Sequence, residues 1–161
     1  MAQTDYFMKI EGIPGESKDA THEGEIDILS WAFGGAQSGS FGGAGGGGSG
    51  KVNFQDLSFT KKLDKATPKL LLKMADGSHI TEAVLVCRKA GTEPLEYLKL
   101  TLNDLLVSSY STGGSGGDVF PHENWSINFS KYKIEYVEQK QDGSGESPVD
   151  TSWNIKTNAK D

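Results

Sequence analysis

A glycine tract followed by a lysine is the most conspicuous candidate for chemistry in this sequence of 161 residues. The segment from Gly45 to Lys51 matches the start of the phosphate-binding loop GxxxxGK[ST], in which backbone amides and a lysine hold nucleotide phosphates. The next position is Val52, which lacks the hydroxyl that would bind magnesium. The residues that follow alternate like a strand, whereas a phosphate loop opens a helix. We therefore expect no nucleotide site.

Histidine and cysteine are the next candidates for catalysis. His22 is followed by Glu23, but position 26 is Ile, so the zinc-protease pattern HExxH is incomplete. Cys87 lies in an apolar run without a histidine nearby in the sequence, which favours a small buried side chain over a nucleophile. The acidic run from Glu16 to Asp27 lacks the ligand spacing of a calcium loop and predicts a solvated edge. We expect no catalytic residue, cofactor or metal, although an enzyme using His22 and the acidic run stays a rival hypothesis.

Charge and hydropathy restrict the partners. The chain has 16 Lys and Arg against 22 Asp and Glu, a net charge of −6, and its longest basic cluster is Lys61-Lys62. Nucleic acids and anionic membranes need concentrated positive charge, so neither is expected as a partner. No apolar run is long enough to insert into a membrane, and the N-terminus lacks the pattern of a cleaved signal. We expect cytoplasmic synthesis, with any export by a route that needs no signal peptide.

Alternating apolar and polar residues predict a mainly β fold. In several runs the apolar positions change from one strand face to the other. The changes are Ile28 to Leu29, Phe54 to Leu57, Leu102 to Leu105, and Phe129 to Tyr132. Because a slip of one residue sends later side chains to the opposite face, each strand either bulges or passes between two buried surfaces. A sandwich with bulges and a small barrel that also packs against a neighbouring subunit both fit this pattern.

One segment, residues 64–76, predicts a short helix instead. Asp64 or Thr67 could cap its N-terminus, Pro68 suits the first turn, and Gly77 could end it. Its apolar stripe would cover one side of the barrel.

Glycine is concentrated in two places. Of 21 glycines, ten fall between Gly34 and Gly50 and four between Gly113 and Gly117. Freezing about ten such residues costs at least ~10 kcal/mol of backbone entropy, so one tract docking alone would bind weakly. If several copies docked together from a symmetric assembly, the high effective concentration of each tract would strengthen the overall binding. The longer tract, which contains Phe41, is therefore a plausible contact arm.

Several segments together resemble one known family. They are residues 15–22, residues 25–31, Ser38-Gly39 before the glycine tract, residues 50–61, residues 64–68, and residues 108–117. In this order and spacing, which runs from about Tyr6 to Trp153-Asn-Ile, they are similar to the Hcp (haemolysin-coregulated) proteins. These are the inner-tube subunits of bacterial type VI secretion systems.

The resemblance implies a single tube domain over residues 1–161. Its fold would be a two-sheet antiparallel β-barrel with one short α-helix, assembling as a hexameric ring. Rings would stack into a tube that contractile sheath proteins expel behind a VgrG spike, with secreted effector proteins carried in the lumen. Such a protein would assemble in the cytoplasm and then reach the medium or a target cell.

The resemblance also implies contact residues. The glycine-rich extended loop, residues 37–50, would reach a neighbouring ring through Gln37, Ser38, Ser40, Phe41, Gly42, Gly45 and Ser49. Ser30 and Ala32 would face the lumen, where Ala32 offers no side-chain hydrogen bond to an effector. The rival to this structural function is a carbohydrate-binding β-barrel in which Trp31, Trp125 or Trp153 stacks on sugar.

Overall fold

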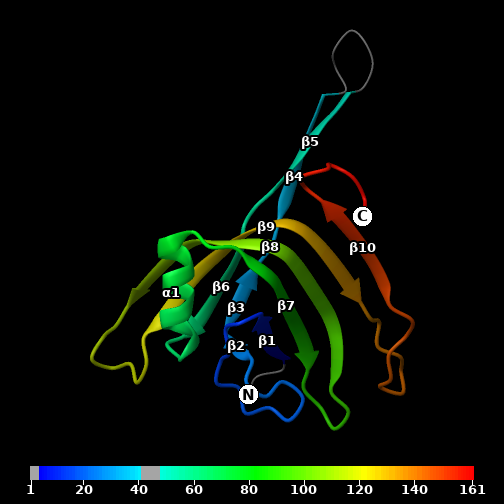
Figure 1. Ribbon diagram of the computed structural model, residues 1–161. Helices are drawn as coiled ribbons and strands as arrows, with labels where there is room; N and C mark the ends of the chain where they lie inside the picture. Colours follow the sequence, from blue (N-terminus) through cyan, green and yellow to red (C-terminus); the bar gives the residue numbers. More distant parts are fainter. Residues whose placement is uncertain (1–3, 41–47) are drawn as a thin grey trace.

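Strands dominate the computed structural model, which describes residues 4–40 and 48–161 (Figure 1). The strands are β1 (Thr4–Ile10), β2 (Ile26–Ile28), β3 (Ser30–Ala32), β4 (Gly35–Ser40), β5 (Gly48–Phe54), β6 (Leu57–Lys62), β7 (Ile80–Lys89), β8 (Leu95–Gly113), β9 (His122–Tyr136) and β10 (Val149–Asn154). One helix, α1 (Ala66–Asp76), lies among them. The expected mainly β fold with one short helix is therefore confirmed.

The larger sheet curves into a nearly closed antiparallel barrel. Its order is β2-β1-β7-β8-β9-β6-β3, and β10 pairs with the part of β9 that β6 leaves free. The two ends of this order meet because β2 and β3 are separated by Leu29 alone, whose amide donates to the carbonyl of Thr60 in β6 at 2.8 Å. The smaller sheet is the pair β4-β5, which projects from the barrel (Figure 1).

The expected face changes occur in two different ways. Between β2 and β3, and between β5 and β6, the strand simply breaks for one or two residues. In β8 and β9 the strands continue, and the two changes lie opposite each other at Asp104 and Ser130. Asp104 adopts a left-handed backbone (φ 53°), and the Ser130 hydroxyl donates to its carbonyl at 3.3 Å. Leu102 and Leu105 can therefore both be buried.

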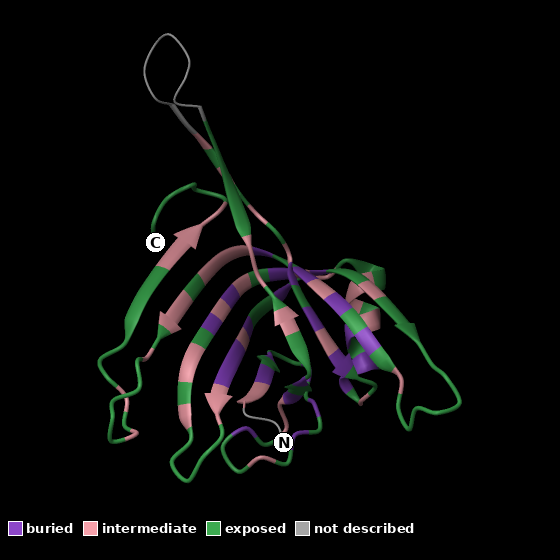
Figure 2. Cartoon of the chain, turned by 180° about the vertical axis from the view of Figure 1, so that it is seen from behind, coloured by how far each residue is buried: buried purple, intermediate pink, exposed green. Residues whose placement is uncertain are grey.

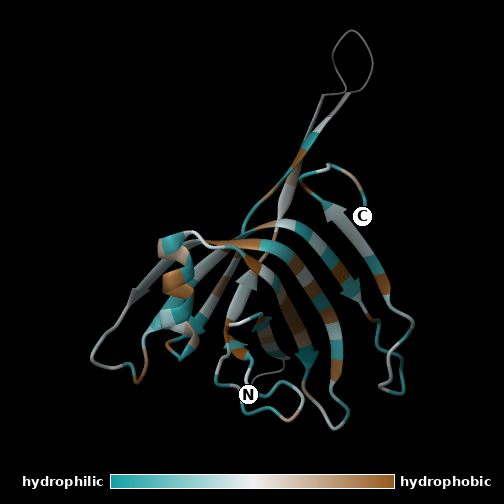
Figure 3. Ribbon diagram, in the orientation of Figure 1, coloured by the Kyte–Doolittle hydropathy of each residue, from teal (hydrophilic) through white to brown (hydrophobic). Residues whose placement is uncertain are grey.

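The core fills the inside of the barrel, and burial alternates along its strands (Figure 2). Apolar residues alternate with polar ones along the middle of β8, whereas β7 carries a continuous apolar run from Ala83 to Cys87 (Figure 3). Helix α1 covers one opening and buries Ala66 and Leu70 completely. Full burial of a large aliphatic side chain such as Leu70 contributes roughly 1.5–3 kcal/mol to the stability of the fold.

Helix α1 starts two residues later than expected, and Asp64, one of the two expected caps, accepts a hydrogen bond at its N-terminus. The Asp64 carboxylate accepts the amide of Ala66 at 2.9 Å, and Glu16, 49 residues away, accepts the amide of Lys65 at 2.7 Å. Thr67 is not a cap: it lies inside the helix, and its hydroxyl donates to Glu123 at 2.8 Å within the core. Gly77 ends the helix in a left-handed conformation (φ 67°), as the sequence predicts.

Candidate assembly and cargo surfaces

The arm, defined as the hairpin of β4 and β5, is the first candidate surface. Its strands pair from Gly35 opposite Phe54 to Ser40 opposite Gly48, with an irregularity at Ser38. Gly50 faces this irregularity so closely that a methyl group there would overlap the backbone oxygen of Ser38. The part of the glycine-rich segment before residue 41 and after residue 47 is thus paired strand, where the sequence predicts an extended loop.

Aromatic rings fix the root of the arm to the barrel. The Phe54 ring at the end of β5 lies 4.9 Å from the ring of Tyr132 and 6.1 Å from that of Phe33, centroid to centroid. Phe33 in turn packs on Phe129 at 5.8 Å. Burial raises the pKa of Tyr132. The direction in which the arm leaves the barrel is therefore set by packing at its base.

Four of the seven residues expected to make ring contacts lie on the described parts of the arm. Gln37 and Ser38 are exposed side chains of β4, while Ser40 and Ser49 belong to the paired strands. Phe41, Gly42 and Gly45 lie outside the described residues.

A face of small polar side chains on the outside of the barrel is the second candidate surface. Cross-strand register aligns Ser30 of β3 with Thr60, Asn124 and Ser111, and a second row aligns Ala32 with Ser58, Ser126 and Ser109. We call these eight residues the hydroxyl face. Ser30 and Ala32, which the resemblance assigns to the lumen, thus lie together at one edge of it.

The hydroxyl face is shallow and uncharged. It forms a hollow of about 360 Å³, and all the described residues that line it are uncharged. Within it the Thr60 hydroxyl donates to the Asn124 side-chain oxygen at 3.0 Å. Such a surface offers weak, short-range hydrogen bonds and no net electrostatic attraction of its own, which suits transient contact with a polypeptide.

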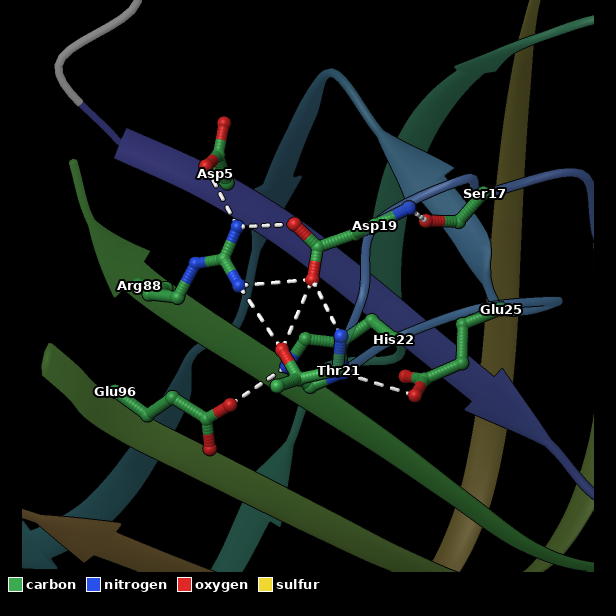
Figure 4. A network of polar contacts seen from close by, with 8 residues as sticks. All are labelled: Asp5, Ser17, Asp19, Thr21, His22, Glu25, Arg88 and Glu96. Atoms are coloured by element: carbon green, nitrogen blue, oxygen red, sulfur yellow. Dashed lines mark hydrogen bonds and ion pairs between the residues drawn. The ribbon is translucent and has the colours of Figure 1, made fainter. Parts of the chain in front are cut away.

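His22 occupies a different environment from the one that catalysis would need. Its Nδ1 lies 2.8 Å from Glu25 and its Nε2 lies 2.6 Å from Glu96, while its ring stacks on Phe7 with centroids 4.4 Å apart (Figure 4). Burial lowers the pKa of His22, but the hydrogen bonds and charges of the two carboxylates outweigh it, so the pKa is raised above its ordinary value of 6.5. With both nitrogens engaged, the ring holds the segment before β2 against the barrel.

Arg88 extends the same network. It donates to both carboxylate oxygens of Asp19, at 2.6 and 2.9 Å, and to Asp5 at 3.1 Å (Figure 4). These hydrogen bonds lower the pKa of Asp19 to below its usual range. The expectation of a merely solvated acidic edge is wrong for Asp19 and Glu25, because Asp19 pairs with Arg88 and Glu25 is bonded to His22. No local pattern could have predicted this pairing, since Arg88 lies 69 residues from Asp19.

The remaining candidate residues are mostly covered. Cys87 is fully buried, and burial raises the pKa of its thiol to about 11. Trp125 is buried as well and donates its indole N–H to Glu123 at 3.2 Å, so it offers no face to a sugar. Trp31 and Trp153 are half-buried.

The described residues, 4–40 and 48–161, also bear on metal binding and on membrane insertion. In these ranges, His, Cys, Asp and Glu side chains form no group of three or more that could hold a metal ion. In the same part of the chain no helix has the length and apolar character needed to span a membrane.

Known proteins match this chain over nearly its whole length. The family model described as "Type VI secretion system effector, Hcp" matches residues 7–136. The chain belongs to the Hcp family. Protein hcp1 of Pseudomonas aeruginosa is 51% identical to it over 158 residues, which cover 97% of this chain and 98% of that protein.

Solved Hcp structures share the fold as well. The crystal structure of Hcp1 from Salmonella typhimurium superposes with a TM-score of 0.83 at 38% identity, covering 99% of this chain and 100% of that one. A type VI secretion system effector from Yersinia pestis gives a TM-score of 0.77 at 33% identity, covering 93% and 99%. A structure described as a type six secretion system protein gives 0.92 at 27% identity, covering 98% and 99%. The resemblance to the Hcp family inferred from the sequence is confirmed.

Proposed function

We propose that this Hcp chain is a single tube domain whose copies close into hexameric rings that stack into the inner tube of a type VI secretion system. The projecting arm carries the proposal. Its two strands pair with each other outside the barrel, so a lone chain gains little buried surface from ordering them. Because the base of the arm is packed on the barrel and its strands project away from it, the arm is well placed to contact another molecule.

The arm supplies the contact between rings in this proposal. Gln37, Ser38, Ser40 and Ser49 would contact the next ring from the paired strands, together with Phe41, Gly42 and Gly45 of the segment that joins them. A single arm binds weakly because its glycines lose backbone entropy on docking. Six arms acting from one ring raise the effective concentration of each contact and make stacking stable.

Strand edges supply the contact within a ring. In the described chain β10 pairs with β9 along one side, and its other side is bridged at its last residue, Asn154, by Ala159. The outer backbone groups of its earlier residues are therefore available to a neighbour. Unpaired strand edges readily accept a further strand or another chain. Sideways packing of this kind would close the ring.

The hydroxyl face would then line the lumen and meet the effector proteins that the tube carries. Ser30 and Ala32 are exposed members of this face, and its uncharged lining supports passage without tight adhesion. The tube would assemble in the cytoplasm, receive a VgrG spike at its tip, and leave when the sheath contracts. Its action would be structural rather than catalytic.

Two measurements test the proposal. Native mass spectrometry of dilute protein is expected to show hexamers, and electron micrographs of concentrated protein are expected to show rings or stacked tubes. A protein that is monomeric in both experiments would contradict the assembly function. A carbohydrate-binding barrel would tolerate that outcome.

A further inference from the structure

A chain of hydrogen bonds runs along one rim of the hydroxyl face. The Asp56 carboxylate accepts the Ser108 hydroxyl at 2.6 Å and the Asn128 amide at 2.9 Å. The Ser108 oxygen lies 2.8 Å from that of Ser126, which is also hydrogen-bonded to Ser109. We call the line from Asp56 through Ser108 and Ser126 to Ser109 the serine chain.

The carboxylate dictates the direction of every bond in the serine chain. A carboxylate only accepts, so Ser108 must donate its one hydroxyl proton to Asp56. Ser126 must then donate to Ser108, and Ser109 must donate to Ser126, because each hydroxyl has a single proton. Ser109, at the far end, keeps its lone pairs for an incoming donor and has no proton left to give.

A β-bulge makes this arrangement possible. The register of β8 against β9 shifts between Val107 and Ser109, which brings two consecutive serines toward the same partner, Ser126. Asp56 stands in the short break between β5 and β6 and lines a separate hollow of about 470 Å³, while Ser109 and Ser126 line the hydroxyl face. The serine chain therefore links a negative charge in one hollow to an uncharged surface in the next.

We propose that Asp56, acting through the serine chain, makes the hydroxyl face selective for cationic hydrogen-bond donors, the guanidinium and ammonium groups of a basic segment of a carried protein. Aligned hydroxyl dipoles strengthen one another and carry partial negative charge toward Ser109. Thr60 adds a second outward acceptor, because its own proton is donated to Asn124. This inference rests on the proposed role of the face in carrying effectors, and Asp56 acts as a positioning residue.

Fluorescence anisotropy with a labelled penta-arginine peptide tests the inference on the assembled protein at low salt. Asp56→Asn removes the charge, and Ser109→Ala removes the terminal acceptor without changing the charge. We expect either variant to bind about tenfold more weakly, which is the loss of one hydrogen bond to a charged group. A penta-glutamate peptide should bind neither variant nor the unchanged protein.

Two matched variants control for general charge and for general surface polarity. Asp118 also accepts a serine hydroxyl, that of Ser115 at 3.1 Å, but in a turn away from the face, so Asp118→Asn is expected to leave binding unchanged. Ser111 lies on the same face outside the serine chain, and Ser111→Ala should be equally silent.

Three results would overturn the inference: no binding of penta-arginine by the unchanged protein, equal losses in Asp56→Asn and Asp118→Asn, or full binding by Ser109→Ala. If Asp56→Asn fails to fold, Ser126→Ala interrupts the same chain and should weaken binding similarly. Electron micrographs of each sample report tube formation separately, so failure of the assembly proposal is distinguishable from failure of this one.

Discussion

Lys61 and Glu123 form a fully buried ion pair beneath helix α1, with the Lys61 Nζ 2.7 Å from the Glu123 Oε1. The ammonium group also contacts Asp64 at 2.7 Å and the Thr67 hydroxyl at 2.9 Å. A pair this deep is costly to desolvate, and it persists only because further hydrogen bonds complete both groups. It ties β6, β9 and the start of the helix together.

Replacing only one member of this ion pair should strongly destabilise the folded protein. Lys61→Met leaves the Glu123 carboxylate buried without a cation, which we expect to lower the free energy of unfolding by ~3–5 kcal/mol in urea titrations. The double variant Lys61→Met/Glu123→Leu should recover most of that loss, although the Trp125 indole then lacks its acceptor. The exposed neighbour Lys62→Met is the control. A loss for Lys61→Met no larger than the control's would contradict the role of the pair.

The His22 contacts should stabilise the protein less as the pH rises. Because the folded state raises the pKa of His22 above 6.5, its contribution is complete below pH 6.5 and is lost as the pH rises through the folded-state value. The difference in unfolding free energy between the unchanged protein and His22→Gln should therefore be larger at pH 5.5 than at about pH 9. His122→Gln, at an exposed position, should show no such trend. A difference that grows with pH would refute this sign.

A methyl group at Gly50 should damage the arm and spare the ring. Gly50→Ala overlaps the Ser38 carbonyl and must push β4 and β5 apart, whereas Gly39→Ala in the same hairpin meets nothing within 4 Å. We expect hexamers from both variants in native mass spectrometry but shorter or absent tubes from Gly50→Ala in electron micrographs. Tubes of normal length from both would argue against stacking through the arm.

Phe41 provides a test of the segment that joins β4 to β5. Phe41→Ala removes the only large side chain of the glycine tract, and we expect intact rings that stack more weakly. Sedimentation of preformed tubes against free rings measures the change. If the variant sediments like the unchanged protein, Phe41 makes no apolar contact with the next ring.

The buried thiol should be chemically silent. With its pKa raised to about 11 and no exposed surface, Cys87 should not react with a thiol reagent at pH 8 until urea unfolds the barrel. Cys87→Ser should fold with a small loss of stability and unchanged tube formation. Rapid labelling of the folded protein would revive a reactive role for this residue.

Periodicity alone predicts most of the strands, because residues that alternate along a strand report which of its faces is buried. It also locates the change of face near Asp104 and Ser130, but not that the two changes lie opposite each other, since register depends on partners far apart in the chain. The helix is predictable from Pro68 and Gly77, whereas its cap from Glu16 is not.

The residues of the candidate surfaces could likewise be predicted only in part from the sequence. Family resemblance points to Ser30 and Ala32, and the structure adds the six residues that share their face. The serine chain cannot be predicted from the sequence, because Asp56 and Ser108 are 52 residues apart and a bulge has no reliable sequence signature. The hydrogen bonds of His22 cannot be predicted either, because one of its partners, Glu96, lies 74 residues away.

The continuity of the arm with the barrel has a mechanical consequence. Strand β4 follows β3 after two residues, and β5 leads into β6 after two more, while β6 is bonded along its whole length to β9. A pull on the arm along its axis therefore acts as shear on the β6–β9 hydrogen bonds, which carry the load together instead of opening one after another. In the proposed tube, tension between stacked subunits during ejection would be distributed over these β6–β9 hydrogen bonds.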